Sequence, residues 1–524
     1  MSPCGAYGVP VSETEIHILQ RRKNLRAIAE LGFDPYPLKY GCTHRLPEVL
    51  AQYATRPAPA LEAHRISLRV AGRVMTLRRH GKAGFAHLAE GGAQLQVYVH
   101  LDAVGERNFE LYKLLDLGDL LGVEGYLFRT QTSELSVHAE RLVLLAKALL
   151  PLAEKWHSPT DAEFRYRQRY IDLTVNPGVR EVFEKRARLA RALREFLDSE
   201  GYLEVETPMI QPLPGGATAR PLTTHLNARD INVYLRVAPE LYLKRLVVAG
   251  IDRVYEMNRN FRNEGISAQD SPEFTTLEFY QAYGDYEDMI RLTERMLRQA
   301  VYGVLGSLDV DFAGHHISFT AFHRLTMKEA VVRFWPVEAG PGPTLEGLKE
   351  PKVIFACVDA YRAWARKAGN GCQAMESLRG KVPGRALQAL FQSVAESKLI
   401  QPTFIVDYPL EVSPLAKQKS DDPDFVERFE LYVGGMKVAN AFSELNDPDE
   451  QRDRFEYQQL LPQKDDLMVH PVDDDYIRAL SYGMPPTGGE GIYFDRLIML
   501  LTNSRSICDV ILFPLLRPEK SREL

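Results

Sequence analysis

The sequence predicts an α+β protein in which a small β-barrel or sandwich precedes an antiparallel sheet that carries helices. Residues 66–145 alternate in hydrophobicity with a period of two and are interrupted by glycine turns, which is typical of short strands in a barrel or sandwich. A helical pattern follows over about residues 179–200. The rest of the chain mixes strands with helices, as α+β domains do.

The first part of the chain is expected to hold helices, the barrel and a link. Residues 1–64 predict an N-terminal helical extension, with a helix over about residues 14–31. The strands occupy residues 65–146, with one helical stretch at 108–115. Residues 147–178 contain proline breakers, and we expect them to link the barrel to the second domain.

The second domain is expected to span residues 179–524 and to begin with the long helix. One face of that helix is apolar at the spacing i, i+4, i+7 and i+8. This face consists of Leu189, Leu193, Phe196 and Leu197. Gly201 is a natural stop for the helix. Residues 336–400 are the least patterned part of the domain and are expected to be an insertion.

Composition and charge narrow the class of protein. At 524 residues the chain has room for two or three domains, and its 45% hydrophobic and 26% charged residues are those of an ordinary soluble globular protein. The net charge of -6 argues against a protein coated in basic surface. A local basic face on an acidic protein still binds phosphates, so a nucleic-acid partner stays open.

Cysteine usage and hydropathy indicate the compartment. The five cysteines are odd in number, widely spaced and never form CxxC pairs, which argues against a disulfide framework and against a zinc site. No run approaches 18 apolar residues, and the N-terminus lacks the basic and apolar regions of a secretory signal. We therefore expect a cytoplasmic protein without a membrane partner.

Three segments carry residue types suited to binding phosphates, bases and ammonium groups. Residues 258–265 (NRNFRNEG) place two arginines and a glutamate around a turn, and residues 272–275 (PEFT) add an aromatic ring. Arginine binds phosphate or carboxylate through paired hydrogen bonds, and an exposed phenylalanine can stack on a base. Residues 488–496 (GGEGIYFDR) turn a glycine strip into an apolar helix, and residues 440–447 (NAFSELND) set acidic groups around an aromatic. Taken singly, each segment also fits a salt bridge or a capped turn.

The long helix and the segment after it that runs into Pro208, the FRNEG…PEFT strand pair and the glycine-to-arginine helix resemble, in this order, the three motifs of class II aminoacyl-tRNA synthetases. The preceding barrel resembles the OB-fold anticodon-binding domain of the lysine, aspartate and asparagine subgroup. Longer segments favour the lysyl-tRNA synthetases within it. These are RYRQRYIDL at 165–173, EVETPMIQPLPGGATARPL at 204–222, PELYLKRLVVAG at 239–250 and FSELNDPDEQRDRF at 442–455. The resemblance runs from the N-terminal helix to nearly the last residue.

The resemblance implies a ligase that activates L-lysine with ATP and transfers it to tRNA(Lys). The lysine carboxylate would attack the α-phosphorus of ATP, and the lysyl group would then pass to the terminal ribose hydroxyl. Catalysis of this kind needs positioning and charge stabilisation rather than a side-chain nucleophile. The resemblance also implies a homodimer, since the first motif forms the dimer interface in this class, and Mg²⁺ as a cofactor.

Individual residues receive roles from the same resemblance. The expected catalytic residues are Arg262, Glu264 and Arg496. The expected ATP-binding residues are Arg262, Glu264, Phe274, Asn440 and Arg496, with Phe274 and Arg496 on the two faces of the adenine. The expected lysine-binding residues are Gly216, Glu240, Arg262, Tyr280, Asn440, Phe442 and Glu444. Glu240 would receive the α-ammonium and Glu444 the ε-ammonium, about a lysine's length apart. The expected anticodon readers are Phe85, Gln96 and Glu134.

Several positions depart from the family pattern, and three of them bear on the nucleotide side of the site. Tyr493 replaces a glycine of the third motif, and Asp270 replaces a histidine before the PEFT segment. Of two family carboxylates that help to bind Mg²⁺, Glu430 remains and the other aligns with Lys437. A charged lysine cannot ligate a metal, because its ammonium has only donors. Lys437 is therefore expected to supply positive charge where the metal would lie, or ATP use is reduced.

Two other functions stay open beside the lysine–tRNA ligase. One is a paralogue that activates lysine or a lysine analogue for an acceptor other than tRNA. The other is a non-catalytic lysine- or tRNA-binding regulator on the same scaffold. The barrel with its anticodon-reading residues favours tRNA as the acceptor.

Overall fold

The computed structural model describes residues 13–152, 162–217, 219–263, 265–369, 382–460 and 472–518. The chain divides into two compact units, residues 1–162 with 173–177 and residues 163–172 with 178–524. The first unit holds the N-terminal helices and the barrel together, so the expected boundaries between extension, barrel and linker stay predictions.

A closed five-stranded barrel forms the centre of the first unit, as the alternating pattern predicts. The strand order is β1-β2-β3-β5-β4, and pairing of β1 with β4 closes the ring. Inward residues such as Leu95, Val97 and Val99 are buried, and the residues between them face outward. The strands are β1 (Ser67–His80), β2 (Ala83–Glu90), β3 (Ala93–His100), β4 (Leu120–Arg129) and β5 (Leu135–Ala146).

Four helices accompany the barrel: α1 (Glu13–Glu30), α2 (Leu46–Tyr53), α3 (Ala58–Ala63) and α4 (Leu101–Leu114). The helix expected near residues 14–31 is therefore present as α1. The helix expected at 108–115 is longer than predicted and begins directly after β3. Gly105 has a φ of 77° inside it, so the chain is kinked there and the helical periodicity is clear only beyond the kink.

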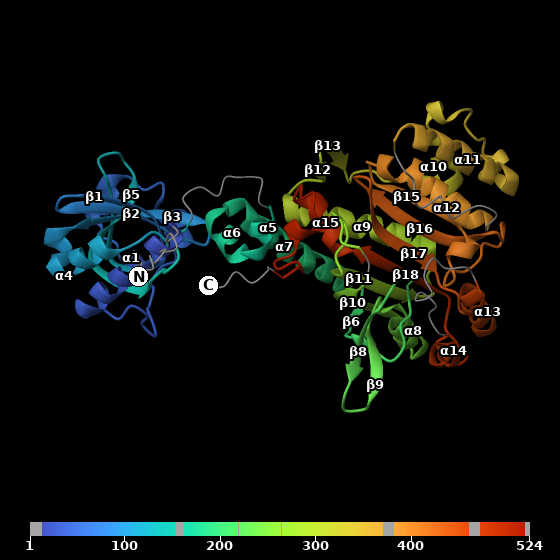
Figure 1. Ribbon diagram of the computed structural model, residues 1–524, viewed down its shortest axis with the longest axis horizontal. Helices are drawn as coiled ribbons and strands as arrows, with labels where there is room; N and C mark the ends of the chain where they lie inside the picture. Colours follow the sequence, from blue (N-terminus) through green and yellow to red (C-terminus); the bar gives the residue numbers. More distant parts are fainter. Residues whose placement is uncertain are drawn as a thin grey trace, which may run out of the picture. The chain divides into compact units, whose positions relative to one another are not determined.

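An eight-stranded sheet in the order β14-β15-β16-β17-β18-β11-β10-β6 forms the second unit's centre (Figure 1). The six central strands pair antiparallel, as expected, and the outermost strand at each edge pairs parallel. The strands are β6 (Leu203–Glu204), β10 (Arg253–Phe261), β11 (Glu273–Ala282), β14 (His323–Thr326), β15 (Thr403–Pro409), β16 (Phe425–Val433), β17 (Met436–Ser443) and β18 (Thr487–Tyr493).

Three helices cover one face of this sheet: α7 (Pro177–Ser199), α9 (Tyr286–Leu305) and α15 (Phe494–Leu501). The predicted apolar face of the long helix is confirmed, because Leu189, Leu193, Phe196 and Leu197 are all buried in this core. Gly201, with a φ of 82°, follows the end of α7. On the opposite face, α8 (Glu240–Val248) packs on β10 and β11 and leaves the middle of the sheet to a pocket.

The segment expected as an insertion holds two helices in its described part, α11 (Pro351–Lys367) and α12 (Pro383–Val394). Helix α12 and helix α10 (Met327–Phe334) pack on β15, and α11 packs on α12 (Figure 1). Helix α12 buries Leu387, Leu390 and Phe391, at the spacing i, i+3 and i+4 of one apolar helix face.

The described residues contain further helices and strands. The helices are α5 (Ala162–Arg167), α6 (Arg169–Val175), α13 (Pro448–Leu460), α14 (Asp474–Leu480) and α16 (Ile507–Val510). The strands are β7 (Ile210–Gln211), β8 (Leu222–Leu226), β9 (Ile231–Leu235), β12 (Asp309–Phe312) and β13 (His315–Ser318).

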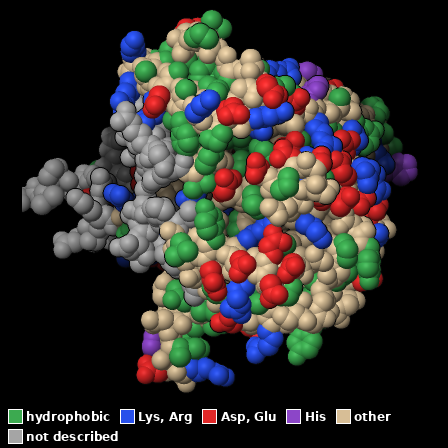
Figure 2. Space-filling view, turned by 90° about the vertical axis from the view of Figure 1, so that its right-hand side faces the viewer, with side chains coloured by type: hydrophobic (Ala, Val, Ile, Leu, Met, Phe, Trp, Pro, Cys, Tyr) green, Lys and Arg blue, Asp and Glu red, His purple; other side chains and the backbone are tan. Residues whose placement is uncertain are grey.

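The surface and the cysteines agree with the composition. Figure 2 shows acidic and basic side chains interspersed over one face of the second unit. Cys42, Cys357 and Cys508, the three cysteines within the described residues, are free thiols. No helix in the described parts of the chain is long and apolar enough to cross a membrane.

Candidate active site

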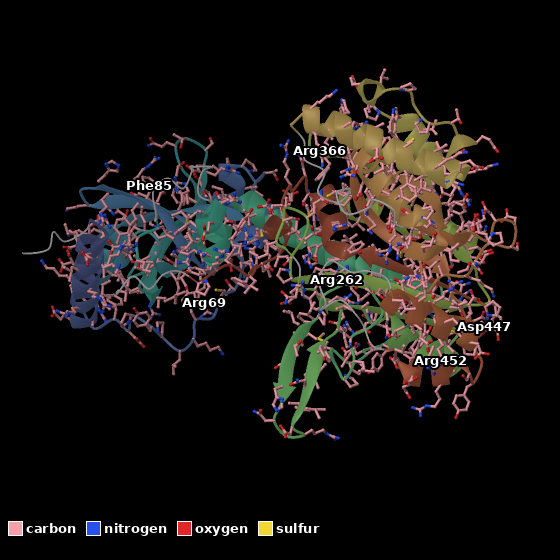
Figure 3. All side chains as sticks on the ribbon, turned by 45° about the vertical axis from the view of Figure 1, so that its right-hand side comes forward. Arg69, Phe85, Arg262, Arg366, Asp447 and Arg452 are labelled. Carbon is pink, nitrogen blue, oxygen red and sulfur yellow. The ribbon has the colours of Figure 1, made fainter. Side chains whose placement is uncertain are left out.

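The second unit carries a pocket on the sheet face opposite α9. Leu277 and Phe279 of β11 point into the core beneath α9, so Glu278 and Tyr280 point to the other face. All seven residues expected to bind lysine line this pocket, although they come from five separate segments. They are Gly216, Glu240, Arg262 (labelled in Figure 3), Tyr280, Asn440, Phe442 and Glu444.

Gly489 of β18 lets two of these side chains approach the sheet. A Cβ atom at this position would lie 2.1 Å from Glu444 Oε1 and 2.4 Å from the Tyr280 ring. Real Cβ contacts are not this short, and both neighbours are buried. Only glycine fits at position 489, because Glu444 and Tyr280 occupy the space of a side chain. These are the two residues that the resemblance assigns to the lysine ε-ammonium.

Lys244, which the sequence reasoning missed, lies between the two expected ammonium receptors. Its Nζ is 2.7 Å from Glu240 Oε1 and also pairs with Glu444 Oε2, and it lies 5.3 Å from the centre of the Phe442 ring. One ammonium reaches both carboxylates, so the expectation that they lie a lysine's length apart is wrong. The spacing of Glu240 and Lys244, one helical turn apart, was the available sequence signal.

The end of the pocket around Glu240, Lys244 and Glu444 is called the lysine end. It keeps a hydrogen-bond acceptor that has no partner among the described residues. Glu444 is 1% exposed, and among the described residues its Oε1 has no hydrogen-bond partner. Burial raises the pKa of Glu444 well above its usual range, and the Lys244 ammonium offsets only part of this. Burial and the Glu240 carboxylate raise the pKa of Glu278, a second residue missed from sequence, to about 7. An entering ammonium lowers both pKa values, because it favours the ionised carboxylates.

The end of the pocket around Arg262 and Tyr493 is called the nucleotide end. There, other side chains of the protein contact the residues expected to hold ATP. The Arg262 Cζ atom lies 5.0 Å from the centre of the Phe274 ring, and Phe274 is 8% exposed. Tyr493 points into the pocket and stacks on Phe274 with ring centres 6.2 Å apart. Asn440 Oδ1 accepts a hydrogen bond of 2.9 Å from Arg428 Nε. Glu264 lies outside the described residues.

Arg496, expected over the adenine, is held by two of the departing residues. Its Nη2 donates to Asp270 Oδ1 at 2.8 Å, and its Nη1 donates to the Lys437 backbone carbonyl at 3.0 Å. Its Cζ atom lies 4.6 Å from the centre of the Tyr493 ring. Asp270 therefore neutralises a cation that the resemblance assigns to ATP.

The position expected for a metal does not fit Mg²⁺. Lys437 Nζ lies 3.1 Å from Glu430 Oε1, which also accepts from Arg428 at 2.7 Å. The hydroxyls of Tyr408 and Tyr432 donate to Oε2 at 2.9 and 2.7 Å. Burial raises the pKa of Glu430, but these neighbours, Lys437 first, hold it at about 2. Both oxygens are occupied, and the described residues contain no group of three or more metal-binding side chains.

The expected anticodon readers come together on the outer face of the barrel. Gln96 Nε2 donates to Glu134 Oε2 at 2.8 Å, and His87 Nε2 lies 3.0 Å from Glu134 Oε1. Phe85 (labelled in Figure 3) is partly exposed rather than a core residue. It begins a row of rings across four strands that the sequence reasoning missed. This aromatic row is Phe85, Tyr98, His138 and Tyr126, with successive ring centres 5.1, 5.3 and 4.9 Å apart.

A closed five-stranded barrel, followed along the chain by a largely antiparallel sheet with a pocket on one face, defines a class II tRNA synthetase with an OB-fold. The family described as tRNA synthetases class II (D, K and N) matches residues 161–517, and the OB-fold nucleic acid binding domain matches residues 68–145. Curated relatives named lysine–tRNA ligase are 45–48% identical. The chain belongs to the lysine–tRNA ligase family of class II tRNA synthetases, as the motifs indicate.

Three relatives show how far the similarity extends. The lysine–tRNA ligase of Syntrophomonas wolfei is 47% identical over 98% of this chain and 100% of its own length. The enzyme of Pelotomaculum thermopropionicum is 48% identical over 95% of this chain and 94% of its own. That of Bacillus cytotoxicus is 45% identical over 96% and 98%. The similarity thus covers both compact units.

Proposed function

We propose that the protein activates L-lysine with ATP and transfers the lysyl group to the 3′ end of tRNA(Lys). The single observation that carries the choice of lysine is the buried Glu444 Oε1, an acceptor without a partner among the described residues, in a pocket rich in carboxyl groups. An aspartate or asparagine side chain would bring another acceptor there, and two acceptors without a shared proton repel each other.

Adenylation is the first step of the proposed reaction. A lysine carboxylate oxygen forms a bond to the α-phosphorus of ATP, and the bond to the bridging oxygen of pyrophosphate breaks. Negative charge then concentrates on the phosphoryl oxygens. Arg262 reaches the pocket from the end of β10, and its fixed positive charge supports this step by stabilising that charge. Mg²⁺ has no place in this scheme at Glu430, because that carboxylate is already saturated.

Transfer to tRNA is the second step. The terminal ribose hydroxyl attacks the lysyl carbonyl, and AMP leaves with the electron pair of the mixed anhydride bond. The barrel supports the choice of tRNA as acceptor. Its aromatic row offers ring faces for unpaired bases, and Gln96 and Glu134 offer hydrogen bonds to base edges. The altered-acceptor and non-catalytic alternatives are not favoured, because relatives named lysine–tRNA ligase match both units.

A homodimer through the edge of the sheet belongs to the same proposal. The edge strand β6 has only two residues, and Leu203 within it is 53% exposed. Ile210 and Tyr283, at 55% and 76% exposed, add apolar surface in the second unit. Exposed apolar residues near an unpaired edge favour burial against another copy of the chain.

The test is lysylation of purified tRNA(Lys) by the full-length protein. With ATP present, we expect labelled lysine to become acid-precipitable, and neither aspartate nor asparagine to do so. Phe85→Ala is expected to weaken tRNA binding about tenfold, since stacking contributes about 1–3 kcal/mol per base. Tyr36→Ala is the matched control, because Tyr36 is an exposed ring of the same unit outside the aromatic row. Charging with aspartate or asparagine instead would overturn the proposal.

A further inference from the structure

The ring of Tyr493 makes the contacts that the adenine of ATP is expected to make. Tyr493 is the last residue of β18 and pairs with Thr276, which puts its side chain on the pocket face with Gly489 and Gly491. There it stacks on Phe274, with ring planes 27° apart, and meets the Arg496 guanidinium at 4.6 Å. A flat ring that contacts both an aromatic and a guanidinium has the chemistry of a bound base.

The phenol oxygen of Tyr493 also meets the charges expected to hold phosphate. Lys437, Arg262 and Arg496 all act on it electrostatically. Burial alone would raise the pKa of this phenol, but the three cations, Lys437 first, lower it to about 8. The Tyr493 side chain therefore presents a ring to Phe274 and Arg496 and an oxygen to the cations expected to hold phosphate.

The Arg496 guanidinium and the Glu430 carboxylate are also paired with other side chains of the protein. Asp270 accepts from Arg496 at 2.8 Å, and Lys437 pairs with Glu430 at 3.1 Å. These two contacts involve residues outside the lysine end, where Glu444 Oε1 keeps its unmatched acceptor. The two ends of the pocket can thus be filled separately.

We propose that Tyr493 is an internal occupant of the adenine position, so that the protein binds lysine with the nucleotide end closed and binds ATP only after this ring rotates out. The inference rests on the proposed function, because it takes ATP as the second ligand. A site that is open for only a fraction of the time binds its ligand more weakly by that fraction. Tyr493 accordingly sets the affinity for ATP, whereas the unmatched acceptor of Glu444 is present while the ring is in place.

The test measures equilibrium binding of β,γ-methylene-ATP and of lysine to the full-length protein by titration calorimetry. Tyr493→Gly, which restores the glycine of the family pattern, is expected to bind the nucleotide analogue at least tenfold more tightly than the parent. Tyr493→Phe keeps the ring and is expected to stay within about threefold of the parent, because the ring fills the position. Lysine binding by each variant reports that it is folded, and Tyr493→Ala replaces the glycine variant if that one does not fold.

Equal affinity of the parent, Tyr493→Gly and Tyr493→Ala for the analogue would overturn the inference. This outcome is distinguishable from failure of the proposed function. If the parent charges tRNA but removal of the ring leaves analogue affinity unchanged, only the inference fails. If no variant charges tRNA while Tyr493→Gly gains analogue affinity, the proposed function fails and the closed adenine position stands.

Discussion

The two ends of the pocket use buried charge in opposite ways. At the lysine end, Glu444 shares Lys244 with Glu240 and keeps one oxygen without a partner in the described structure. At the nucleotide end, Glu430 receives hydrogen bonds or ion pairs on both oxygens. Both carboxylates are almost fully buried, so exposure does not distinguish them.

The difference lies in whether the surrounding groups saturate the carboxylate. A buried charge whose hydrogen-bonding positions are all filled stabilises a fixed arrangement and has nothing left for a ligand. A buried acceptor with one position unfilled favours any ligand that brings a donor. The lysine end therefore keeps one acceptor position unfilled among the described residues, whereas both oxygens of Glu430 are taken by side chains of the protein.

The largest effect is expected when Glu444 is removed from the lysine end. Glu444→Gln should weaken lysine binding at least a hundredfold and destabilise the fold by about 3 kcal/mol, because it leaves the fully buried Lys244 with one fewer carboxylate. Calorimetric lysine titration and urea denaturation would measure the two effects.

A double variant separates these two effects. Adding Lys244→Met to Glu444→Gln removes the uncompensated ammonium, so stability should largely return while lysine binding stays lost. Recovery of lysine binding in the double variant would show that Glu444 acts only through folding.

A smaller effect is expected from restoring a carboxylate at the metal position. Lys437→Glu would place an acid beside Glu430 and should destabilise the protein by about 2 kcal/mol, part of which millimolar MgCl₂ restores. Thermal denaturation with and without MgCl₂ measures this. Lys437→Met is the matched control and should lose stability without gaining a response to Mg²⁺. An equal stabilisation of the parent by Mg²⁺ would contradict the internal ion pair.

The smallest effect is expected at Glu490 of β18. Its side chain points to the face of the sheet opposite the pocket. It is 2% exposed and accepts one hydrogen bond, from Thr293 at 2.5 Å, and burial raises its pKa to about 8. The native state therefore binds this proton more tightly than the unfolded state. The stabilisation that protonated Glu490 gives the folded state is fully present below a pH of about 4.5, and it is lost as the pH rises toward about 8.

Glu490→Gln should remove this pH dependence and stabilise the protein at pH 8 by about 1 kcal/mol, with little change at pH 5. Urea denaturation at the two pH values measures the difference. Glu456→Gln, at an exposed position of α13, is the matched control and should leave the profile of the parent. If the stability of Glu490→Gln changes with pH as that of the parent does, Glu490 is not the source of the pH dependence.

The sequence predicted much of the fold, because burial with a regular period is a local signal. The apolar face of α7 and the alternation in the barrel are both repeated within a few residues, and both were found. The helix that contains Gly105 was harder, since the kink at this residue interrupts the period. The seven lysine-pocket residues were found by resemblance, whereas Lys244 and Glu278 were not.

The sequence by itself determined the family, the fold class and the residues that meet in the pocket, since motif order and periodicity are properties of the chain alone. Only the tertiary structure decided what those residues contact. Pairing of Tyr493 with Thr276 fixes the face to which its ring points, and Asp270 meets Arg496 across 226 positions of sequence. Strand register and long-range ion pairs exist only after folding, because they join segments that carry no local record of one another.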